Sequence, residues 1–350
     1  MADLFGTYNK RIKLTISNTN IDAELTWFPL TVFLTSTQGE EVFAEFDADA
    51  DFDRVAFTTS DESTQLYADC ELFDDSESKA IYHVSKTGWA ISNTGTTDFY
   101  MYYDDNADHN TTYISKSGGT AAQSVWDGDY EAVYHMADGA STSAIYDSTS
   151  NNNDGTKTAA DNPIEVAGQV GLAQDFDGDD NIDIGSVSNS ASWTIEGFVK
   201  LDVADANYTW LNRYIDFRAY MNADPTPKLR VRHDTDVYET YSMTNSISVD
   251  RYYYLVWTFN DTTCYAYIDG VANGSWTDSI KTASSNMDIG TASGYTPFKG
   301  NIGEVRISSA LRSAAWNKAT SNSLWDTLLT YGDEETGGVT YNSIMFGANF

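Results

Sequence analysis

Short segments in which apolar and polar residues alternate recur along the chain, and they limit the folds open to it more than any other feature. In residues 10–17, Ile12, Leu14 and Ile16 fall on one face of an extended segment. Residues 42–53 give the same pattern, with Phe46 and other apolar residues on one face and acidic residues on the other. Turn clusters of Gly, Asn, Asp and Ser separate the segments. Further strand candidates, rich in aromatic and β-branched residues, are 98–103, 193–201, 252–259, 264–270 and 301–308. The pattern predicts an all-β fold of antiparallel sandwiches.

The size and charge of the chain limit the number of domains and the classes of partner that we expect. Its 350 residues are enough for two domains with a core each, and its 14% aromatic content is typical of a globular protein. With a net charge of −32 and only 20 Lys and Arg residues, it should repel nucleic acid and anionic membranes. We find neither a secretory signal nor an apolar segment long enough to span a membrane. We therefore expect synthesis in the cytoplasm, no nucleic-acid partner and no membrane insertion.

A segment rich in small and polar residues is expected to divide the chain into two domains. Residues 115–124 read as a linker, which predicts a first β-sandwich domain at 1–124 and a second at 125–332. One helix is expected, at 310–329, where Leu311, Trp316, Leu324, Trp325 and Leu328 could form an apolar stripe. A polar, glycine-containing tail at 333–350 ends in apolar residues and is interpreted as a contact within an assembly.

The spacing of the cysteine and histidine residues indicates neither a disulfide nor a metal site. Cys70 and Cys264 are far apart and lie in different predicted domains, so a disulfide between them is not expected, and no metal-type CxxC spacing occurs. The histidines (His83, His109, His135 and His233) stand alone, without HxH or HExxH spacing. The sequence therefore gives no support for zinc.

The acidic stretch FDGDDNIDIG, residues 176–185, admits two interpretations. As a calcium loop of EF-hand type starting at Asp175, it has Asp180 where glycine is required and Ser186 where Glu is required. As a hairpin, Asp177 and Gly178 form the turn, and Ile182 and Ile184 point inward from the next strand. The hairpin fits better.

The order of motifs in the second half of the chain resembles the laminin-G-like, concanavalin A-like jelly-roll family of lectins and adhesins. The resemblance covers about residues 126–330 and rests on AVYHMAD, DSTSNNNDGT, AGQVGLAQDFDGDDNIDIG, SWTIEGFVKL, YYYLVWTFNDTTCYAYIDGV, MDIG and FKGNIGEVRISSALRS. The first part resembles the uncharacterised β-sandwich family that often precedes such a domain, on NKRIKLTISNTNIDAELTWFPLTVFL, FDRVAFTTSDESTQLYADCELFD and TTDFYMYYDDNADHN. The resemblance implies two antiparallel jelly-roll sandwiches, the second concanavalin A-like, followed by a short C-terminal helix.

The resemblance also implies one structural calcium ion near the first and last strands of the jelly roll. Asp147 and Asp154 of the DSTSNNNDG loop and Glu304 of NIGEVRI are the residues that match the family's ligand positions. The family usually has Ile-Asp-Glu-Val at the last site, whereas this chain has Gly303 before Glu304, which removes one hard oxygen ligand. The alternative is that Asp147 and the asparagines form Asx turns.

Sugar binding in such folds uses exposed aromatic rings that stack on pyranose rings, with polar groups that hold the hydroxyls. The matching loop residues are Trp210, Arg213, Tyr214, Tyr238, Tyr241 and Tyr295. The competing interpretation is that a sandwich this rich in aromatics buries most of them.

Catalysis is not expected. Glu45, Asp47 and Asp49 have the alternate spacing of a retaining glycosidase pair, but they lie in the first domain, which does not resemble a glycosidase. Glu196, in the second domain, has no acidic residue two positions away. We interpret the chain as non-catalytic.

The family implied by these motifs occurs in surface and virion proteins, and no common reaction is attached to it. We therefore expect a virion component such as a capsid, tail-fibre or spike protein, located at the virion surface. Its partners would be other copies of itself, other virion proteins and host cell-surface glycans. A glycoside hydrolase of the same fold and a cellular surface adhesin are the alternatives.

Overall fold

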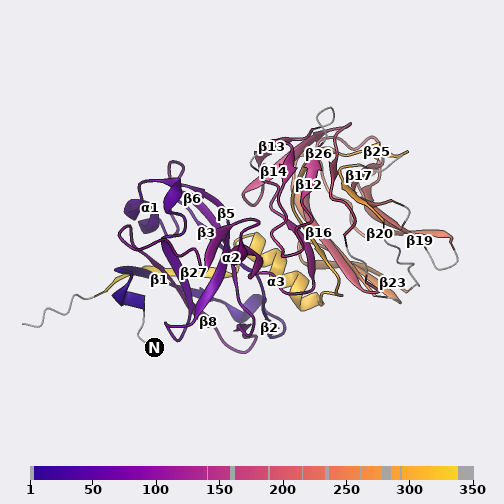
Figure 1. The fold of residues 1–350 in the computed structure, drawn as a ribbon. Coiled ribbons are helices and arrows are strands. Elements are labelled where there is room, and N and C mark those ends of the chain that lie inside the picture. Colours follow the sequence, from indigo (N-terminus) through magenta and orange to yellow (C-terminus); the bar gives the residue numbers. More distant parts are fainter. Residues whose placement is uncertain are drawn as a thin grey trace, which may run out of the picture.

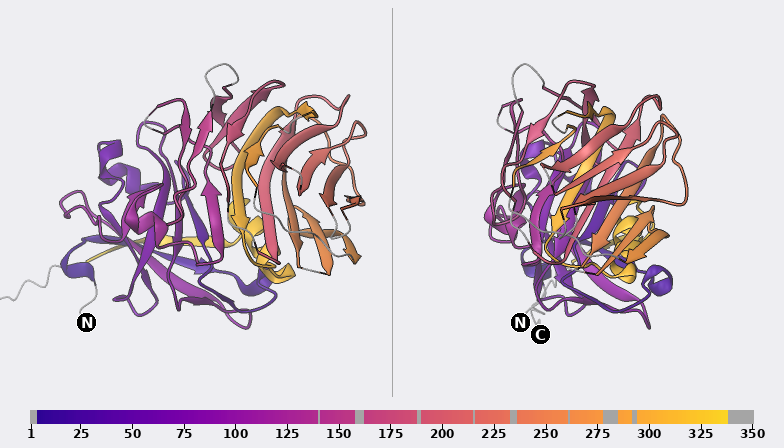
Figure 2. Two further views of the ribbon diagram at one scale, coloured as in Figure 1. Left: turned by 45° about the vertical axis from the view of Figure 1, so that its right-hand side comes forward. Right: turned by 90° about the vertical axis from the view of Figure 1, so that its right-hand side faces the viewer.

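The structure is a computed structural model that describes residues 4–139, 141–157, 162–187, 190–214, 216–232, 236–260, 262–277, 285–291 and 294–337. Two bodies built from strands lie side by side, and helix α3 (Ala314–Leu324) lies between them (Figures 1 and 2). The expected all-β fold with a short C-terminal helix is confirmed. None of the helices in the described ranges is long and apolar enough to cross a membrane.

The N-terminal body is a curled sheet, and the strands listed here are those of the described residues. In spatial order they are β27 (Leu329–Thr336), β1 (Lys10–Ile16), β8 (Thr97–Tyr103), β4 (Val55–Thr59), β5 (Gln65–Asp74), β6 (Lys79–Ser85) and β3 (Leu30–Leu34), with β9 (Ile114–Lys116) parallel to β5. A small separate sheet pairs β2 (Leu25–Thr26) with β7 (Ala90–Ile91). Its short helices are η1 (Leu4–Gly6), η2 (Asn18–Asn20), α1 (Glu41–Glu45), η3 (Asp49–Asp51) and α2 (Thr120–Gln123).

The second body is a sandwich of two sheets. The inner sheet, which faces the N-terminal body, has the order β13 (Ile164–Ala167), β14 (Leu172–Asp177), β26 (Lys299–Ser308), β16 (Trp193–Leu201), β21 (Tyr252–Phe259), β22 (Thr263–Ile268) and β23 (Val271–Thr277), with β10 (Tyr130–Tyr134) beside β26. The outer sheet has the order β11 (Ala144–Ile145), β12 (Gly155–Lys157), β15 (Ile182–Asp183), β24 (Met287–Ile289), β17 (Tyr208–Arg213), β18 (Phe217–Met221), β19 (Pro227–Arg232) and β20 (Tyr238–Ser242), with β25 (Thr296–Pro297) parallel to β17.

The middle strands of the inner sheet are buried on both faces. One face of β16 sends Ile195 and Val199 into the core between the two sheets of the sandwich. The opposite face sends Phe198 into an apolar cluster with Ile81 of β6 and Leu324 of α3. All but one of the residues of β16 are buried, as expected for a strand that is covered on both faces. The ligand-accessible face of the sandwich is consequently that of the outer sheet.

The chain returns to its N-terminal body after α3. β27 pairs with β1 in antiparallel register, from Lys10 opposite Thr336 to Ile16 opposite Leu329. The expected helix at 310–329 is therefore too long, because the segment after Leu324 turns and becomes a strand. Residues 333–336 of the expected tail lie in this strand, and residues 338–350 lie outside the described residues.

The segment expected to be a linker is packed. Residues 115–124 contribute to β9 and form α2, in which Ala121 and Ala122 are buried. Val125 and Trp126 then join the N-terminal core. The division of the chain at residues 124 and 332 stays a prediction.

Two local predictions are wrong. Residues 42–53 form α1 and η3, not a strand, because one helical turn also places Val42 and Phe46 on the same buried face. The stretch 176–185 is a turn, but β14 and β15 belong to different sheets, so it crosses the sandwich and is not a hairpin. Ile182 and Ile184 are buried, as expected.

Candidate functional site

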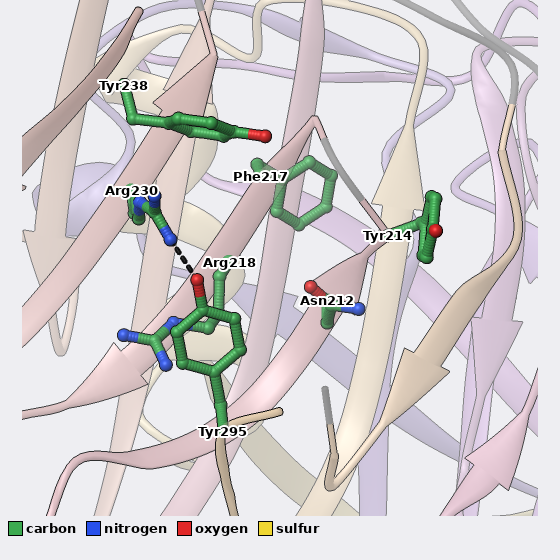
Figure 3. A pocket seen from close by; sticks show the side chains of 7 residues that line it. All are labelled: Asn212, Tyr214, Phe217, Arg218, Arg230, Tyr238 and Tyr295. Atoms are coloured by element: carbon green, nitrogen blue, oxygen red, sulfur yellow. Dashed lines mark hydrogen bonds between the residues drawn. The ribbon is translucent and has the colours of Figure 1, made fainter. Parts of the chain in front are cut away.

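The candidate site is a pocket of about 250 Å³ on the solvent face of the outer sheet. Its walls come from β17, β18, β19, β20 and the segment before β25 (Figure 3). The residues that line it are Asn212, Tyr214, Phe217, Arg218, Arg230, Tyr238 and Tyr295.

Strand register brings its polar residues into one row. Arg218 lies opposite Asn212 of β17 on one side and opposite Arg230 of β19 on the other. Alternate residues of a strand point to opposite faces, and Ala219 and Leu229 lie in the core of the sandwich. The side chains of the row therefore project away from the core and into the pocket.

Tyrosine rings hold both guanidinium groups. The Arg218 guanidinium lies 4.0 Å from the ring centre of Tyr220 and 3.8 Å from that of Tyr295. The Arg230 guanidinium lies 4.0 Å from the ring centre of Tyr238 and donates a hydrogen bond to the Tyr295 hydroxyl (Figure 3). Contacts of a cation with an aromatic face are attractive and fix the plane of the guanidinium. We call Arg218, Arg230, Tyr238 and Tyr295 the arginine–tyrosine ladder.

The ladder is a positive spot on a strongly negative protein. The chain carries a net charge of −32, yet the described residues that line the pocket include two arginines and no carboxylate. Arg218 is only 7% exposed, and its Nε has no hydrogen-bond partner. Burial lowers the pKa of the Arg218 guanidinium, which nevertheless remains charged at neutral pH. Such a group gains free energy from an anion that reaches it.

An acidic pair continues the row on the other side of Asn212. Asp288 of β24 lies opposite Asn212, and Asp183 of β15 lies opposite Asp288. Burial and the nearby charge of Asp183 raise the pKa of Asp288 to about 6. The row therefore runs from negative to positive across the sheet, which orients a polar ligand along it.

Three of the predicted sugar-binding residues come together in this pocket. Tyr214, Tyr238 and Tyr295 line it, and they are 65%, 40% and 42% exposed. Rings this exposed present a face to a ligand.

The other three predicted residues do not line the pocket. Trp210 is fully buried in the core of the sandwich, and Tyr241 is buried with its ring stacked on Trp276. Arg213 is buried and donates a hydrogen bond of 2.6 Å to the carbonyl of Val187. Their expected place on the surface is wrong, because Trp210 and Arg213 lie in strand β17 and not in a loop, and Tyr241 of β20 packs in the core of the sandwich.

Sequence reasoning missed Asn212, Phe217, Arg218 and Arg230. A signal for the arginines was present, since Arg218 and Arg230 alternate with apolar residues in FRAYM and KLRVR. In a chain with 20 basic residues, two arginines on the outward face of adjacent strands form a local concentration of positive charge.

The residues expected to bind calcium are used in other ways. The Asp147 carboxylate accepts hydrogen bonds from the backbone of Val133, Thr149 and Asn153, each at 2.9 Å. Asp154 accepts one from the backbone of Asp147, also at 2.9 Å. Of these bonds, the one from Thr149, two residues after Asp147, has the spacing of an Asx turn.

Glu304 has partners of a different kind. One of its carboxylate oxygens lies 2.7 Å from His135 Nδ1, and the other accepts a hydrogen bond of 2.7 Å from Arg306 Nε. The clusters of potential metal ligands among the described residues do not combine Glu304 with Asp147 or Asp154. Calcium binding stays a prediction.

The carboxylates weighed for glycosidase chemistry are not arranged as a pair. Glu45 ends α1, Asp47 follows it in a loop, and Asp49 begins η3, so they do not alternate along a strand. Glu196 of β16 is fully buried opposite Arg306, and neither of its carboxylate oxygens has a hydrogen-bond partner in the structure. Burial raises the pKa of Glu196.

Comparison with solved structures finds similar folds. Domain 4 of an extracellular arabinanase from Geobacillus stearothermophilus, solved with arabinotriose, is 21% identical over 55% of this chain and 98% of that domain, with a TM-score of 0.46. The binding domain of Paraclostridial Mosquitocidal Protein 1 is 13% identical over 56% of this chain and 52% of that one, with a TM-score of 0.45. The CBM40 domain of a Ruminococcus gnavus IT-sialidase, bound to α2,3-sialyllactose, is 13% identical over 37% of this chain and 82% of that one, with a TM-score of 0.33.

The family comparison agrees with the resemblance seen in the motifs. No curated protein matches the sequence. Residues 176–316, which span most of the sandwich and all strands that line the pocket, match the model of the concanavalin A-like lectin/glucanases superfamily. In this part, the chain is similar to the concanavalin A-like lectin/glucanases superfamily.

Proposed function

We propose that the chain is a non-catalytic binding protein whose lectin-like domain holds an acidic carbohydrate on the arginine–tyrosine ladder. The observation that carries this proposal is the pair of guanidinium groups of Arg218 and Arg230, which are held between exposed tyrosine rings in a pocket without carboxylates.

The chemistry of the lining matches a sugar that carries a carboxylate or sulfate. A guanidinium binds such a group through two parallel N–H···O bonds, and its planar shape gives the contact direction. The exposed rings of Tyr214, Tyr238 and Tyr295 offer flat apolar surfaces to the C–H face of a pyranose ring. Because the rings already fix both arginines, little side-chain entropy is lost on binding.

The lining favours an acidic over a neutral sugar. Arginine, asparagine and tyrosine donate hydrogen bonds, and the lining lacks the carboxylates that usually accept them from sugar hydroxyls. The volume of about 250 Å³ lies below the roughly 300–1,000 Å³ of sites for larger ligands. We therefore infer that the pocket takes the acidic terminal residue of a glycan.

Direct binding measurements test the proposal. Calorimetry should show binding of sialylated or uronic-acid oligosaccharides and weaker binding of neutral ones, with an affinity that falls as salt increases. Arg230→Gln and Tyr295→Ala should each weaken binding at least about tenfold, which is the loss of one charge-assisted or stacking contact. Tyr265→Ala is the matched control, because Tyr265 is 37% exposed on the inner sheet, away from the pocket. Equal binding of neutral and acidic sugars, or full affinity in both pocket variants, would refute it.

The non-catalytic part of the proposal has its own assay. Incubation with a panel of polysaccharides should release no reducing ends, because none of the described residues that line the pocket is a carboxylate that could act as acid or nucleophile. Release of reducing ends by the wild-type chain would favour the alternative of a glycoside hydrolase.

Within the same proposal, the chain serves as a displayed attachment component of a virion, or of a cell surface as the alternative. A net charge of −32 supports this role, since it keeps densely displayed copies soluble. Mass spectrometry should detect the chain either in purified virions or in cell envelopes, and its absence from both would contradict the role.

A further inference from the structure

Four metal-ligating side chains from the two bodies meet at their interface. Glu71 of β5 and His83 of β6 come from the N-terminal body, and His135, which follows β10, and Glu304 of β26 come from the second. One donor atom from each lies within 4.8 Å of the other three. All four side chains are at most 1% exposed. We call these residues the His–Glu cluster.

The distances within the cluster are close to those of a tetrahedral site. Glu71 Oε2 lies 2.8 Å from His83 Nε2 and 3.6 Å from His135 Nδ1, and His135 Nδ1 lies 2.7 Å from Glu304 Oε2. Ligands at about 2.0–2.1 Å from a Zn²⁺ ion are about 3.4 Å apart. The three distances lie on either side of that value, and because the two imidazole rings are parallel and stacked, one ring must also turn before both nitrogens can point at one ion.

Each histidine is already oriented from its other ring nitrogen. His83 Nδ1 lies 3.2 Å from the hydroxyl of Thr31, and His135 Nε2 lies 3.0 Å from a carboxylate oxygen of Asp69. Metal-binding histidines characteristically donate their second N–H to a carboxylate, hydroxyl or carbonyl, which fixes the tautomer and aims the free nitrogen at the metal. The histidine partners found here are of this kind.

The carboxylates show the same organisation. Arg306 Nε donates a hydrogen bond of 2.7 Å to Glu304 Oε1, which leaves Oε2 directed at the cluster. Glu71 Oε1 is buried and has no hydrogen-bond partner in the structure. A buried carboxylate oxygen without a partner is costly, and a cation beside that carboxylate would reduce the cost.

The charge of the interface is compatible with a bound cation. Asp69, Glu71 and Glu304 contact the two histidines, whereas one arginine, Arg306, bonds to one of the three carboxylates. The imidazole rings are stacked with centres 4.5 Å apart, so they repel each other if both are protonated. A divalent cation between neutral imidazoles would balance the buried negative charge without that repulsion.

β-Bulges aim both glutamates. The register between β5 and β6 shifts between Cys70 and Leu72, at Glu71, and Glu304 lies where β26 is irregular opposite β16, with a φ of +43°. A bulge turns a side chain away from the ordinary pleat. A cleft of about 420 Å³ lined by Glu71 and His135 gives an ion a route from solvent.

We propose that the His–Glu cluster binds one Zn²⁺ ion, which joins the N-terminal body to the lectin-like domain. Glu71 Oε2, His83 Nε2, His135 Nδ1 and Glu304 Oε2 supply the ligands. Two imidazoles and two carboxylates form a ligand set that suits zinc, whereas calcium and magnesium prefer oxygen alone.

Metal analysis of the chain, produced without a polyhistidine tag, tests the site. After loading with Zn²⁺ and dialysis against millimolar Mg²⁺ and Ca²⁺, which displace ions from the acidic surface, the wild-type chain should retain one zinc per molecule. Chelation should lower its Tm by about 5 °C or more. Replacement of zinc by Co²⁺ should give the visible absorption of a tetrahedral site. A folded wild-type chain that retains no metal and keeps its Tm on chelation would overturn the proposal.

Variants locate the ion. Glu71→Gln and His83→Gln should each reduce retained zinc to below about a tenth and remove the cobalt absorption. His109→Gln is the control, because His109 is 47% exposed and paired with Asp53, outside the cluster. Retention of zinc by both cluster variants at the level of the control would place the ion elsewhere and refute the assignment. If a variant fails to fold, chelation and cobalt substitution of the wild-type chain decide the question.

Discussion

Replacement of Asp288 by asparagine should stabilise the lectin-like domain at neutral pH. Asp288 lies on β24 in the polar row that leads to the pocket, opposite Asp183 and Asn212. Burial and the charge of Asp183 raise its pKa from 3.8 to about 6. The ionised carboxylate is therefore less stable in the folded chain than in the unfolded one.

The size of the effect follows from the shift. A difference of about two pKa units corresponds to about 3 kcal/mol at about 1.4 kcal/mol per unit. Asp288 is only partly buried, so solvent screening reduces this to about 1–2 kcal/mol. Because the folded pKa is the higher one, the folded state binds the proton more tightly. The destabilisation is fully present above pH 6 and is relieved as the pH falls from 6 towards 3.8.

Urea unfolding of the wild-type chain and of Asp288→Asn, monitored by tryptophan fluorescence at several pH values, measures this difference in stability. At pH 8 the variant should be more stable by about 1–2 kcal/mol, and at pH 4 the two curves should nearly coincide. Asp183→Asn, which removes the neighbouring charge and keeps the Asp288 carboxyl, should give a smaller gain. Equal stability at pH 8, or a gain that does not change with pH, would show that the carboxylate carries no such cost.

Two further predictions concern packing. In Gly290→Ala the new Cβ would lie 2.1 Å from a ring carbon of Phe176 at a φ of +88°, so we expect a loss of about 3 kcal/mol in the free energy of unfolding, measured by urea denaturation. Gly185→Ala, at a φ of +65° with open space around it, should cost about 1 kcal/mol, and equal losses would contradict the steric argument. The Tyr331 hydroxyl donates a hydrogen bond of 2.7 Å to the Phe33 carbonyl and accepts one of 3.1 Å from the Phe33 N–H. Tyr331→Phe removes both bonds from β3, which is an edge strand. We expect a loss of about 1–3 kcal/mol and faster hydrogen exchange at Phe33, and unchanged exchange would show that water replaces the hydroxyl.

The fold class could be predicted because alternation reports local burial, and burial decides the class. The same signal failed at residues 42–53, where Val42 and Phe46 are buried from one face of a helical turn. A period of two and a period near four agree over so short a segment. It also failed to show that β14 and β15 join different sheets, because a turn signal does not specify the partner of the next strand.

The tyrosines of the candidate site could be predicted from the sequence, whereas the meeting of its arginines could not. Tyr214, Tyr238 and Tyr295 stood out as aromatic residues in polar surroundings, which is a local property. The meeting of Arg218 with Arg230 is a matter of register between β18 and β19, and one-residue slippage would separate them. Register depends on tertiary packing, which spacing in the sequence does not encode.

The two proposed sites lie on opposite sides of one sandwich and can be separated physically. The arginine–tyrosine ladder is on the solvent face of the outer sheet, and the His–Glu cluster is on the far face of the inner sheet, against the N-terminal body. The core between the sheets contains Trp210 and Trp257, both fully buried, and close-packed cores of this kind deform little. Loss of an ion at the interface would therefore loosen the orientation of the two bodies and leave the pocket intact. Sugar affinity should then be the same with and without metal, since a joint between domains sets where the pocket points, whereas the register of the outer sheet sets what it binds.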